Sequence, residues 1–320
     1  MNRGLTALAL VACILFGWYL NSSFHSIESV HSISQVRENS PEYQFINPLL
    51  YIDNSSVVYT ELDPLKHDLE RYVEREIFHK RAEKVAVYYR ELNSGVWVGV
   101  NPDEKFVPAS ILKVANLITY LRLAEDEPDI MERRVYYEKN PNDRQNYPPT
   151  KVLESGYYPV RELLGQSIIE SDNAAARALS TPIEKEIGKL FISLNLPMFP
   201  YDASDFMSPR EVSRIFRTLY SSTYLLNSYS EQALKLLTQT KFSKGITQGI
   251  GDKVKVAHKF GERVNGTNDR IDSIELHDCG IVYVPENPYL LCIMTRGKDL
   301  LSLESAIASI SKLVYENLPN

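Results

Sequence analysis

Three apolar stretches near the carboxyl end decide the fold: KVKVAHKFG (253–261), HDCGIVYV (277–284) and YLLCIMT (289–295). Each is short and rich in residues that favour strands. The sequence PENP (285–288) joins the last two, and Pro and Asn are common in turns. The sequence therefore predicts three strands that follow one another in this part of the chain.

A further pair of strands is predicted near the amino end. KVAVYYREL (84–92) and VWVGV (96–100) are separated by the tripeptide NSG, which indicates a hairpin. An amphipathic helix over 62–79 precedes them and another over 300–318 ends the chain, because both stretches repeat apolar residues at helical spacing.

The middle section, from residue 110 to about 250, shows helical periods interrupted by Pro, Gly and Asn. Strands are thus predicted at both ends of the chain, with helices between them. We expect a mixed α/β fold of the α+β type. In this fold an antiparallel sheet is flanked by the amino- and carboxyl-terminal helices, and a helical subdomain lies beside it.

Composition excludes several classes of protein. The 320 residues are 44% hydrophobic and 24% charged, close to the globular average, which argues against a disordered or multi-span membrane protein. The net charge is −6, whereas a nucleic-acid binder shows a basic excess. The histidines are scattered and no C-x-x-C pair occurs, so we expect neither a metal nor a cofactor.

The first twenty residues indicate export. GLTALALVACILFGWYL (4–20) is an apolar run behind Arg3 and is followed by polar residues. This length and the lack of an A-x-A cleavage site favour an uncleaved signal anchor. A cleaved signal peptide and a lipoprotein acylated at Cys13 are the alternatives. All three place the remainder of the chain outside the cytoplasm.

The domain organisation follows from these patterns. Residues 1–20 are the predicted signal anchor or signal peptide. Residues 21–60 are rich in Ser, Asn and Glu without a sustained period, which predicts an extracytoplasmic tether. Residues 61–320 form the predicted globular domain, which we expect to be monomeric.

Two cysteines fall in the neighbouring strands near the carboxyl end. If Val284 lies opposite Tyr289, Cys279 lies opposite Met294 rather than Cys292. We therefore interpret Cys279 and Cys292 as buried thiols and not as a disulfide.

Ser110 and Lys113 form an S-x-x-K tetrad at the start of an apolar helical run. Unpaired backbone N–H groups at a helix start can stabilise an oxyanion. The i to i+3 spacing places the Lys113 ammonium on the same face as the Ser110 hydroxyl. A desolvated lysine can take the proton of a serine, which makes that serine a nucleophile.

Two other short motifs gain meaning in combination with this one. Ser171-Asp172-Asn173 is turn or helix-start material by itself. Lys259 lies on a predicted strand and could present an ammonium at a cleft edge. Gly261 follows two residues later and would allow close approach of a ligand or of backbone.

In order, S-x-x-K, S-D-N and K-x-G resemble the three motifs of the penicillin-recognising serine enzymes, which include class A β-lactamases and penicillin-binding proteins. The separations of 61 and 88 residues between their first positions are similar to those of class A β-lactamases. The flanking stretches FVPASILKVANLITYL (106–121) and SGYYPVRELLGQSIIESDNAAARAL (155–179) resemble the family as well. The resemblance covers roughly 60–320 and implies a β-lactamase/transpeptidase-like fold.

The resemblance also implies a role for each matching residue. Ser110 would be the acylated nucleophile, Lys113 its base, and Ser171 the shuttle that carries the proton to the leaving nitrogen. Lys259 would orient the substrate carboxylate and tune Ser171. Substrate binding would fall to the side chain of Asn173, to Gly261 and to Glu262, whose backbone N–H would form the oxyanion hole with that of Ser110.

The chain departs from the family at the omega loop. Class A β-lactamases carry a glutamate there, in an E-x-x-L-N context, that positions water for deacylation. The stretch LFISLNLPMFPYDASDF (190–206) contains no glutamate, and the acid is missing ahead of Leu194-Asn195. Asp202 is the nearby candidate for a substitute base, while Asp205 matches a structural loop aspartate.

A second departure lies in the K-x-G motif. Phe260 replaces the hydroxyl residue of K-T-G or K-S-G, so one hydrogen bond to the substrate carboxylate is lost. Arg263 or Arg270 could compensate with a bidentate contact.

The resemblance implies a class A β-lactamase-like serine hydrolase that opens β-lactam rings through a Ser110 acyl-enzyme. The alternative is a D-alanyl-D-alanine peptidase, that is, a penicillin-binding protein, or an acylated sensor without turnover. The missing glutamate motivates this alternative. The expected partner is a small-molecule β-lactam or a cell-wall peptide, together with the membrane through the amino-terminal segment.

Overall fold

The computed structural model describes residues 34–37, 42–53, 62–140, 145–198, 204–266 and 270–318. The predicted signal segment lies outside these residues. Among the helices that are described, none has the length and apolar character needed to cross a bilayer.

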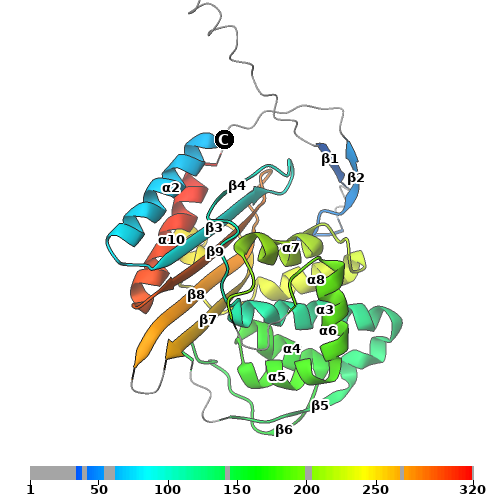
Figure 1. Cartoon of the computed structure of the whole chain (residues 1–320). Coiled ribbons are helices and arrows are strands. Elements are labelled where there is room, and N and C mark those ends of the chain that lie inside the picture. Colours follow the sequence, from blue (N-terminus) through cyan, green and yellow to red (C-terminus); the bar gives the residue numbers. More distant parts are fainter. Residues whose placement is uncertain are drawn as a thin grey trace, which may run out of the picture.

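A five-stranded antiparallel sheet forms the centre of the molecule, in the order β4-β3-β9-β8-β7 (Figure 1). β3 from the amino end pairs with β9 from the carboxyl end, so both ends of the chain build one sheet, as predicted. The strands are β3 (Lys84–Glu91), β4 (Trp97–Val100), β7 (Val256–Gly266), β8 (Ile271–Val282) and β9 (Tyr289–Gly297).

Helices α2 (Asp63–Phe78) and α10 (Leu300–Glu316) cover one face of this sheet (Figure 1). Their apolar stripes are buried against the sheet together with the short helix α9 (Ile246–Ile250). Successive residues of a strand point to opposite faces. In β3, Val85 and Val87 therefore pack toward these helices, and Ala86 packs toward the other face.

The helical subdomain covers the other face. Its helices are α3 (Lys113–Asp126), α4 (Val160–Ile169), α5 (Asn173–Ser180), α6 (Glu184–Ser193), α7 (Pro209–Tyr220) and α8 (Asn227–Leu237). Short 3₁₀ turns lie at Ala109–Leu112, Pro128–Glu132 and Thr181–Ile183, and β5 (Arg134–Tyr137) pairs with β6 (Gly156–Pro159). This architecture matches the predicted α+β arrangement.

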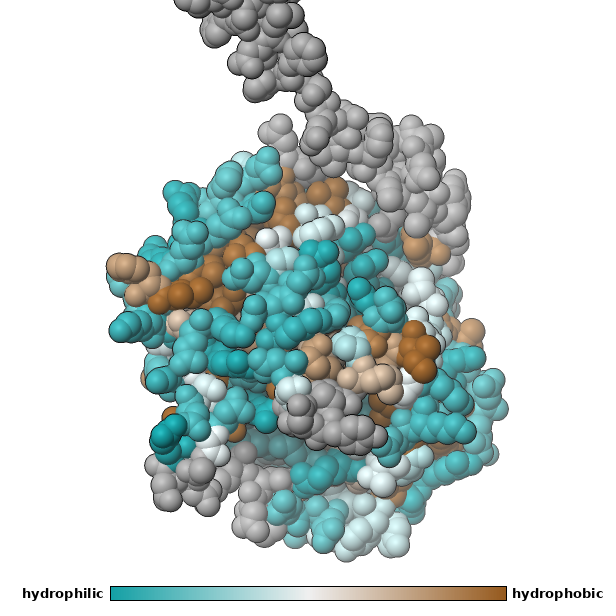
Figure 2. Space-filling model, viewed as in Figure 1, coloured by the Kyte–Doolittle hydropathy of each residue, from teal (hydrophilic) through white to brown (hydrophobic). Residues whose placement is uncertain are grey.

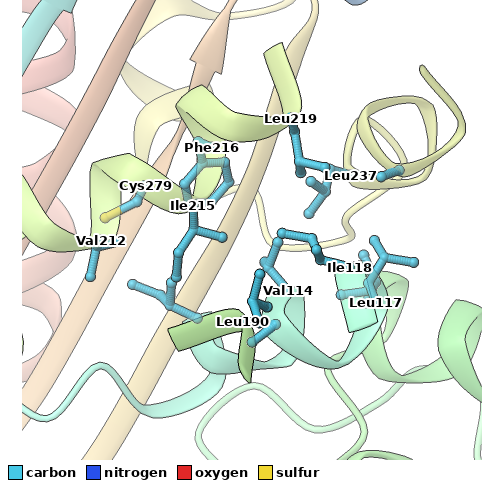
Figure 3. Packing of buried hydrophobic residues seen from close by; sticks show 14 of the residues in the cluster. Val114, Leu117, Ile118, Leu190, Val212, Ile215, Phe216, Leu219, Leu237 and Cys279 are labelled. Carbon is cyan, nitrogen blue, oxygen red and sulfur yellow. The ribbon is translucent and has the colours of Figure 1, made fainter. Parts of the chain in front are cut away.

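Helix α7 joins the sheet to the rest of the subdomain. It contacts β3, β8 and β9, and Figure 3 shows Val212 beside Cys279, and Ile215 and Phe216 facing the α3 side chains. The start of α7 is encoded locally, since Ser208 and Glu211 form a capping box and Pro209 occupies the first turn. Such a cap contributes about 1 kcal/mol.

Part of the predicted tether packs on this subdomain. β1 (Ser34–Arg37) pairs with β2 (Leu49–Asp53), and Phe45 and Ile46 between them are buried in the core. The Glu231 carboxylate accepts the backbone N–H groups of Gln44, Phe45 and Ile46 at 2.9, 2.7 and 3.0 Å. Residues 42–49, within the predicted tether, thus pack on the subdomain.

The interpretation of Cys279 and Cys292 as thiols was wrong, because the two form a disulfide. The register explains the error. Val282, and not Val284, lies opposite Tyr289, which places Cys279 directly opposite Cys292. β8 ends at Val282, two residues earlier than expected, and the Tyr283 N–H that follows donates to Lys255 O, just ahead of β7, at 2.9 Å.

Candidate active site

Ser110 lies in a strained turn that leads into α3. It is the second residue of the 3₁₀ turn Ala109–Leu112, and α3 begins at Lys113. Ala109 before it has a φ of 51°, a left-handed conformation that costs a non-glycine residue about 1–3 kcal/mol. Ser110 is half-buried and lines a cleft of about 1700 Å³. The turn therefore presents its hydroxyl to this cleft.

Lys113 lies one helical turn after Ser110 and is almost fully buried. Its Nζ donates to Ser171 O at 2.6 Å, to Ser171 Oγ at 3.2 Å and to Asn173 Oδ1 at 2.7 Å. The S-x-x-K and S-D-N motifs are thus in direct contact, through residues that are 58 positions apart in the sequence.

Ser171 is held in an unusual backbone conformation ahead of α5. Its φ is 57° and its side chain is 1% exposed. The next residue, Asp172, caps α5 by accepting the Ala175 N–H at 3.0 Å, and it also accepts the Tyr137 hydroxyl at 3.0 Å. Asp172 is therefore a structural residue of the loop, and its contacts fix where Ser171 lies.

Lys259 completes this buried cluster from the sheet. It lies on β7, which is an edge strand, and its side chain is 0% exposed. Its Nζ donates to Ser171 Oγ at 2.8 Å and to Phe260 O at 3.0 Å. Burial, together with the nearby charge of Lys113, lowers the pKa of Lys259 well below its ordinary value. Ser171 Oγ thus lies between two lysines.

Gly261 allows β7 to approach the nucleophile turn. A Cβ at this position would lie 2.4 Å from Pro108 O and 3.3 Å from the backbone N of Ile111. The strand and the turn therefore touch through backbone atoms, and any side chain here would separate them. Glu262, the next residue, is half-buried and lines the same cleft as Ser110.

Phe260 is 2% exposed and does not line the cleft. Its ring stacks on Phe242 with centroids 4.2 Å apart and meets Tyr147 edge-on at 5.5 Å. It belongs to the core on the α2 and α10 side of the sheet. Of the two arginines considered as compensation, Arg263 lines the cleft, whereas Arg270 is exposed and pairs with Asp272.

One part of the cleft lining is apolar. It consists of Ile187 and Phe191 of α6, together with Met198 after it, and we call these three residues the apolar wall. Phe191 occupies the position where the E-x-x-L-N pattern requires the acid. Among the described residues that line the cleft, the carboxylates are Glu184 and Glu262.

The two candidate aspartates of the omega loop have different outcomes. Asp202 lies outside the described residues. Asp205 pairs with Arg296 of β9 at 2.5 Å, and Arg296 also bonds to Glu275 through its Nε at 2.9 Å. Asp205 therefore ties its loop to the sheet, which agrees with the structural role expected for it.

Two buried histidines lie behind the site on β7 and β8. His258 Nδ1 and Asp278 Oδ1, on neighbouring strands, are 2.8 Å apart. His277 Nε2 donates to Val107 O at 3.1 Å, and its Nδ1 accepts the Thr295 N–H at 3.1 Å. Burial lowers the pKa of His277 to about 4. The neutral ring thus holds the backbone just ahead of the nucleophile turn.

Sequence reasoning missed one edge of the cleft. Gln145 and Asn146 line it, and Gln145 Nε2 donates to Ser171 O at 3.1 Å. These residues lie in a polar stretch without periodicity or motif, so nothing in the sequence signals their place. Most of the molecular face shown in Figure 2 is hydrophilic, with a few hydrophobic patches. The polarity of a loop therefore does not distinguish a cleft residue from any other surface residue.

Comparisons with known proteins agree with the fold and with the motifs. The model of the Beta-lactamase enzyme family matches residues 68–318. A beta-lactamase of Streptomyces fradiae is 23% identical over 224 residues, which are 64% of this chain and 71% of that protein. The chain therefore belongs to the Beta-lactamase enzyme family and is a β-lactamase-like serine hydrolase.

Solved structures share the fold. A class A beta-lactamase from Mycobacterium abscessus superimposes with a TM-score of 0.64 at 21% identity, covering 78% of this chain and 98% of that one. The structure of PBP-A gives a TM-score of 0.67 at 19% identity, with 80% of this chain and 96% of that one covered. At these identities the likeness defines the architecture alone.

Proposed function

We propose that this protein opens β-lactam rings by forming an ester between Ser110 Oγ and the ring carbonyl carbon. The observation that carries the proposal is the direct contact of Lys113, Ser171 and Lys259 beside the cleft that Ser110 lines. A serine is a weak nucleophile until a base takes its proton. The buried amine chain supplies such a base one helical turn away.

The proposed proton path runs through this chain. Lys113 takes the proton of Ser110 as Oγ attacks the carbonyl carbon, and Ser171 gives a proton to the ring nitrogen as the C–N bond breaks. Lys113 then restores the proton of Ser171. The hydrogen bond from Lys113 Nζ to Ser171 Oγ, at 3.2 Å, and that from Lys259 Nζ, at 2.8 Å, support this sequence.

Two backbone N–H groups would stabilise the oxyanion. They belong to Ser110 and Glu262, on two segments that Gly261 allows to touch, and preorganised donors of this kind contribute about 3–4 kcal/mol to a transition state. Asn173 would bind the amide of the substrate side chain while its Oδ1 accepts from Lys113. These roles follow the motif assignments.

We propose that hydrolysis of the acyl-enzyme is the slow step. The family glutamate is missing from the sequence, and the buried ring of Phe191 lines the cleft at its position. The apolar wall has no group that could activate water, and the α6 carboxylate that does line the cleft, Glu184, lies outside the E-x-x-L-N position. We therefore expect the Ser110 acyl-enzyme to form readily and to hydrolyse slowly.

The proposed setting is outside the cytoplasm, with a β-lactam or a cell-wall peptide as the partner and a monomeric chain. Residues 1–20 would serve as the signal anchor or signal peptide, and their apolar composition supports this. Members of the Beta-lactamase enzyme family, to which the chain belongs, are typically extracytoplasmic.

Intact mass over time, after mixing residues 42–320 with a penicillin, tests the function. An adduct of one penicillin that persists for many minutes is expected, and Ser110→Ala should abolish it. Asp202→Asn should leave its formation unchanged. A transient adduct with rapid accumulation of opened penicillin would contradict slow deacylation, and labelling that survives Ser110→Ala would refute the nucleophile.

A further inference from the structure

A short segment forms the rim of the cleft at the end nearest Ser171. We call Gln145–Tyr147 the rim segment. Gln145 and Asn146 line the cleft, and Tyr147 packs behind them. The segment has no regular secondary structure, so its position depends on side-chain contacts.

One carboxylate supplies most of these contacts. The side chain of Glu262 on β7 accepts the Asn146 N–H at 3.0 Å, the Asn146 Nδ2 amide at 2.6 Å and the Tyr147 N–H at 3.1 Å. Hydrogen bonds to a charged acceptor are about twice as strong as neutral ones. Glu262 therefore fixes two consecutive residues of the rim segment to the strand that carries Lys259.

Tyr147 adds a second attachment. Its hydroxyl donates to Glu304 of α10 at 2.5 Å. Its ring meets Phe242 at 4.9 Å and Phe260 at 5.5 Å, both edge-on. Phe260 has no hydroxyl that could bind a substrate, but its ring packs against Tyr147 of the rim segment.

The third attachment reaches the proton relay. Gln145 Nε2 donates to Ser171 O at 3.1 Å, and this same carbonyl accepts Lys113 Nζ at 2.6 Å. Ser171 has a strained backbone, with a φ of 57°. A strained conformation persists only where its surroundings hold it, and Gln145 is one of the groups that hold it.

We propose that the Glu262 carboxylate is a positioning residue for acylation: it holds the rim segment on β7, and through Gln145 the segment supports Ser171 in the proton relay. This rests on the proposed function, and it gives the side chain of Glu262 a role separate from its backbone N–H. The effect reaches the reacting atoms only through Gln145 and Ser171.

A double-mutant cycle tests this route. Acylation by a penicillin is measured against concentration for Glu262→Ala, Gln145→Ala and the double variant, which separates the limiting acylation rate from the apparent dissociation constant. Glu262→Ala should lower the limiting rate by about 10- to 100-fold, the range expected for lost charge-assisted hydrogen bonds. The double variant should be no slower than the slower single variant, because both changes break one route.

Two further variants calibrate the cycle. Glu262→Gln keeps one oxygen that can accept a rim N–H, so its rate should lie between wild type and Glu262→Ala. Glu162→Ala removes an exposed carboxylate of α4 and should leave the rate unchanged. Independent effects that multiply in the double variant, or a change in the apparent dissociation constant alone, would overturn the proposal.

Hydrogen exchange provides a readout that does not depend on acylation. In Glu262→Ala, backbone amides of 145–150 and of 170–175 should exchange faster, while those of β8 should not. Unchanged protection at 170–175 would refute the route from the rim segment to Ser171. If wild-type protein is not acylated at all, the proposed function fails, and this measurement still decides the inference.

Discussion

Two parts of the cleft lining differ in polarity. In one part, Lys113 and Asn173 line the cleft and belong to a largely buried, hydrogen-bonded cluster with Ser171 and Lys259; in another part, Ile187, Phe191 and Met198 form the apolar wall. Polar groups are expensive to bury unless each has a partner. The cluster meets that cost through its hydrogen bonds, and the apolar wall avoids it. Under the proposed function, this difference favours formation of the acyl-enzyme over its hydrolysis.

The largest expected effect is on the acylation rate, when Lys259 of β7 is removed from the hydrogen-bonded cluster. Lys259→Met should lower the acylation rate by about 10³-fold, the usual range for loss of a group in a proton relay. Stability should change by no more than about 1–3 kcal/mol, because burial of the amine is relieved by a side chain of similar volume, while Phe260 O and Ser171 Oγ each lose one donor. Rapid-quench kinetics and urea unfolding measure the two quantities.

Lys244→Met provides the matched control, since Lys244 is exposed and should change neither quantity. A Lys259→Met protein that loses stability and keeps its acylation rate would show that the buried amine is structural.

Acid should loosen the support of the nucleophile turn. The lowered pKa of His277, about 4 against an ordinary 6.5, means that the unfolded chain binds this proton more readily than the native protein. The contribution of His277 is therefore fully present above pH 6.5 and is lost as the pH falls toward 4. It amounts to about 3 kcal/mol.

Urea unfolding at pH 7 and pH 4 checks this prediction. His277→Leu should be less stable at pH 7, because Val107 O and the Thr295 N–H lose their partner, and its stability should vary less over this range. Equal pH dependence in the two proteins would exclude His277 as the titrating group.

Adding a carboxylate to the apolar wall should accelerate hydrolysis of the acyl-enzyme. Phe191→Glu places a carboxylate where the E-x-x-L-N pattern has one, so hydrolysis of the acyl-enzyme should accelerate by about 10- to 100-fold. Phe191→Leu keeps the wall apolar and should leave the adduct lifetime unchanged. The decay of the adduct by intact mass distinguishes them, and equal lifetimes would place the missing function elsewhere.

The smallest expected effect concerns the two arginines considered as compensation for Phe260. Their substitution should change the apparent dissociation constant for penicillin to different extents. Arg270 is exposed and pairs with Asp272, so Arg270→Ala should change the apparent dissociation constant for penicillin by less than about twofold. Arg263 lines the cleft, and Arg263→Ala should weaken binding by several-fold. A larger effect at Arg270 would reverse the assignment of the compensating cation.

Much of the fold could be predicted because periodicity records which face of an element is buried. The strands at 84–92 and 289–295 and the helices at both ends follow directly from this pattern. The spacing of Ser110, Ser171 and Lys259 carried the resemblance. Lys259 is hydrogen-bonded to Ser171, and Ser110 lines the cleft beside them. Register was not predictable, since the alternation is the same after a shift of two residues, and the Cys279–Cys292 disulfide was therefore missed.

The rim segment was missed for a different physical reason. Its position depends on contacts between residues more than one hundred positions apart, such as Asn146 with Glu262. No local propensity encodes such a contact. Phe260 was recognised as a departure, but its aromatic partners Phe242 and Tyr147 became visible only in three dimensions.

The clasp around residues 42–49 has a mechanical consequence. A pull on the amino end of the chain acts first on the β1–β2 pair and on the Arg37 side chain, which donates to Asn47 O at 2.7 Å. It then acts on Glu231 and its three backbone donors, on the Asn47 N–H bonded to Tyr220 O at 2.8 Å, and on the Tyr283 hydroxyl bonded to Phe45 O at 3.0 Å. None of these residues lines the cleft. Force on the amino end is thus borne by the β1–β2 pair, α7, α8 and the β8–β9 turn, away from the residues that line the cleft.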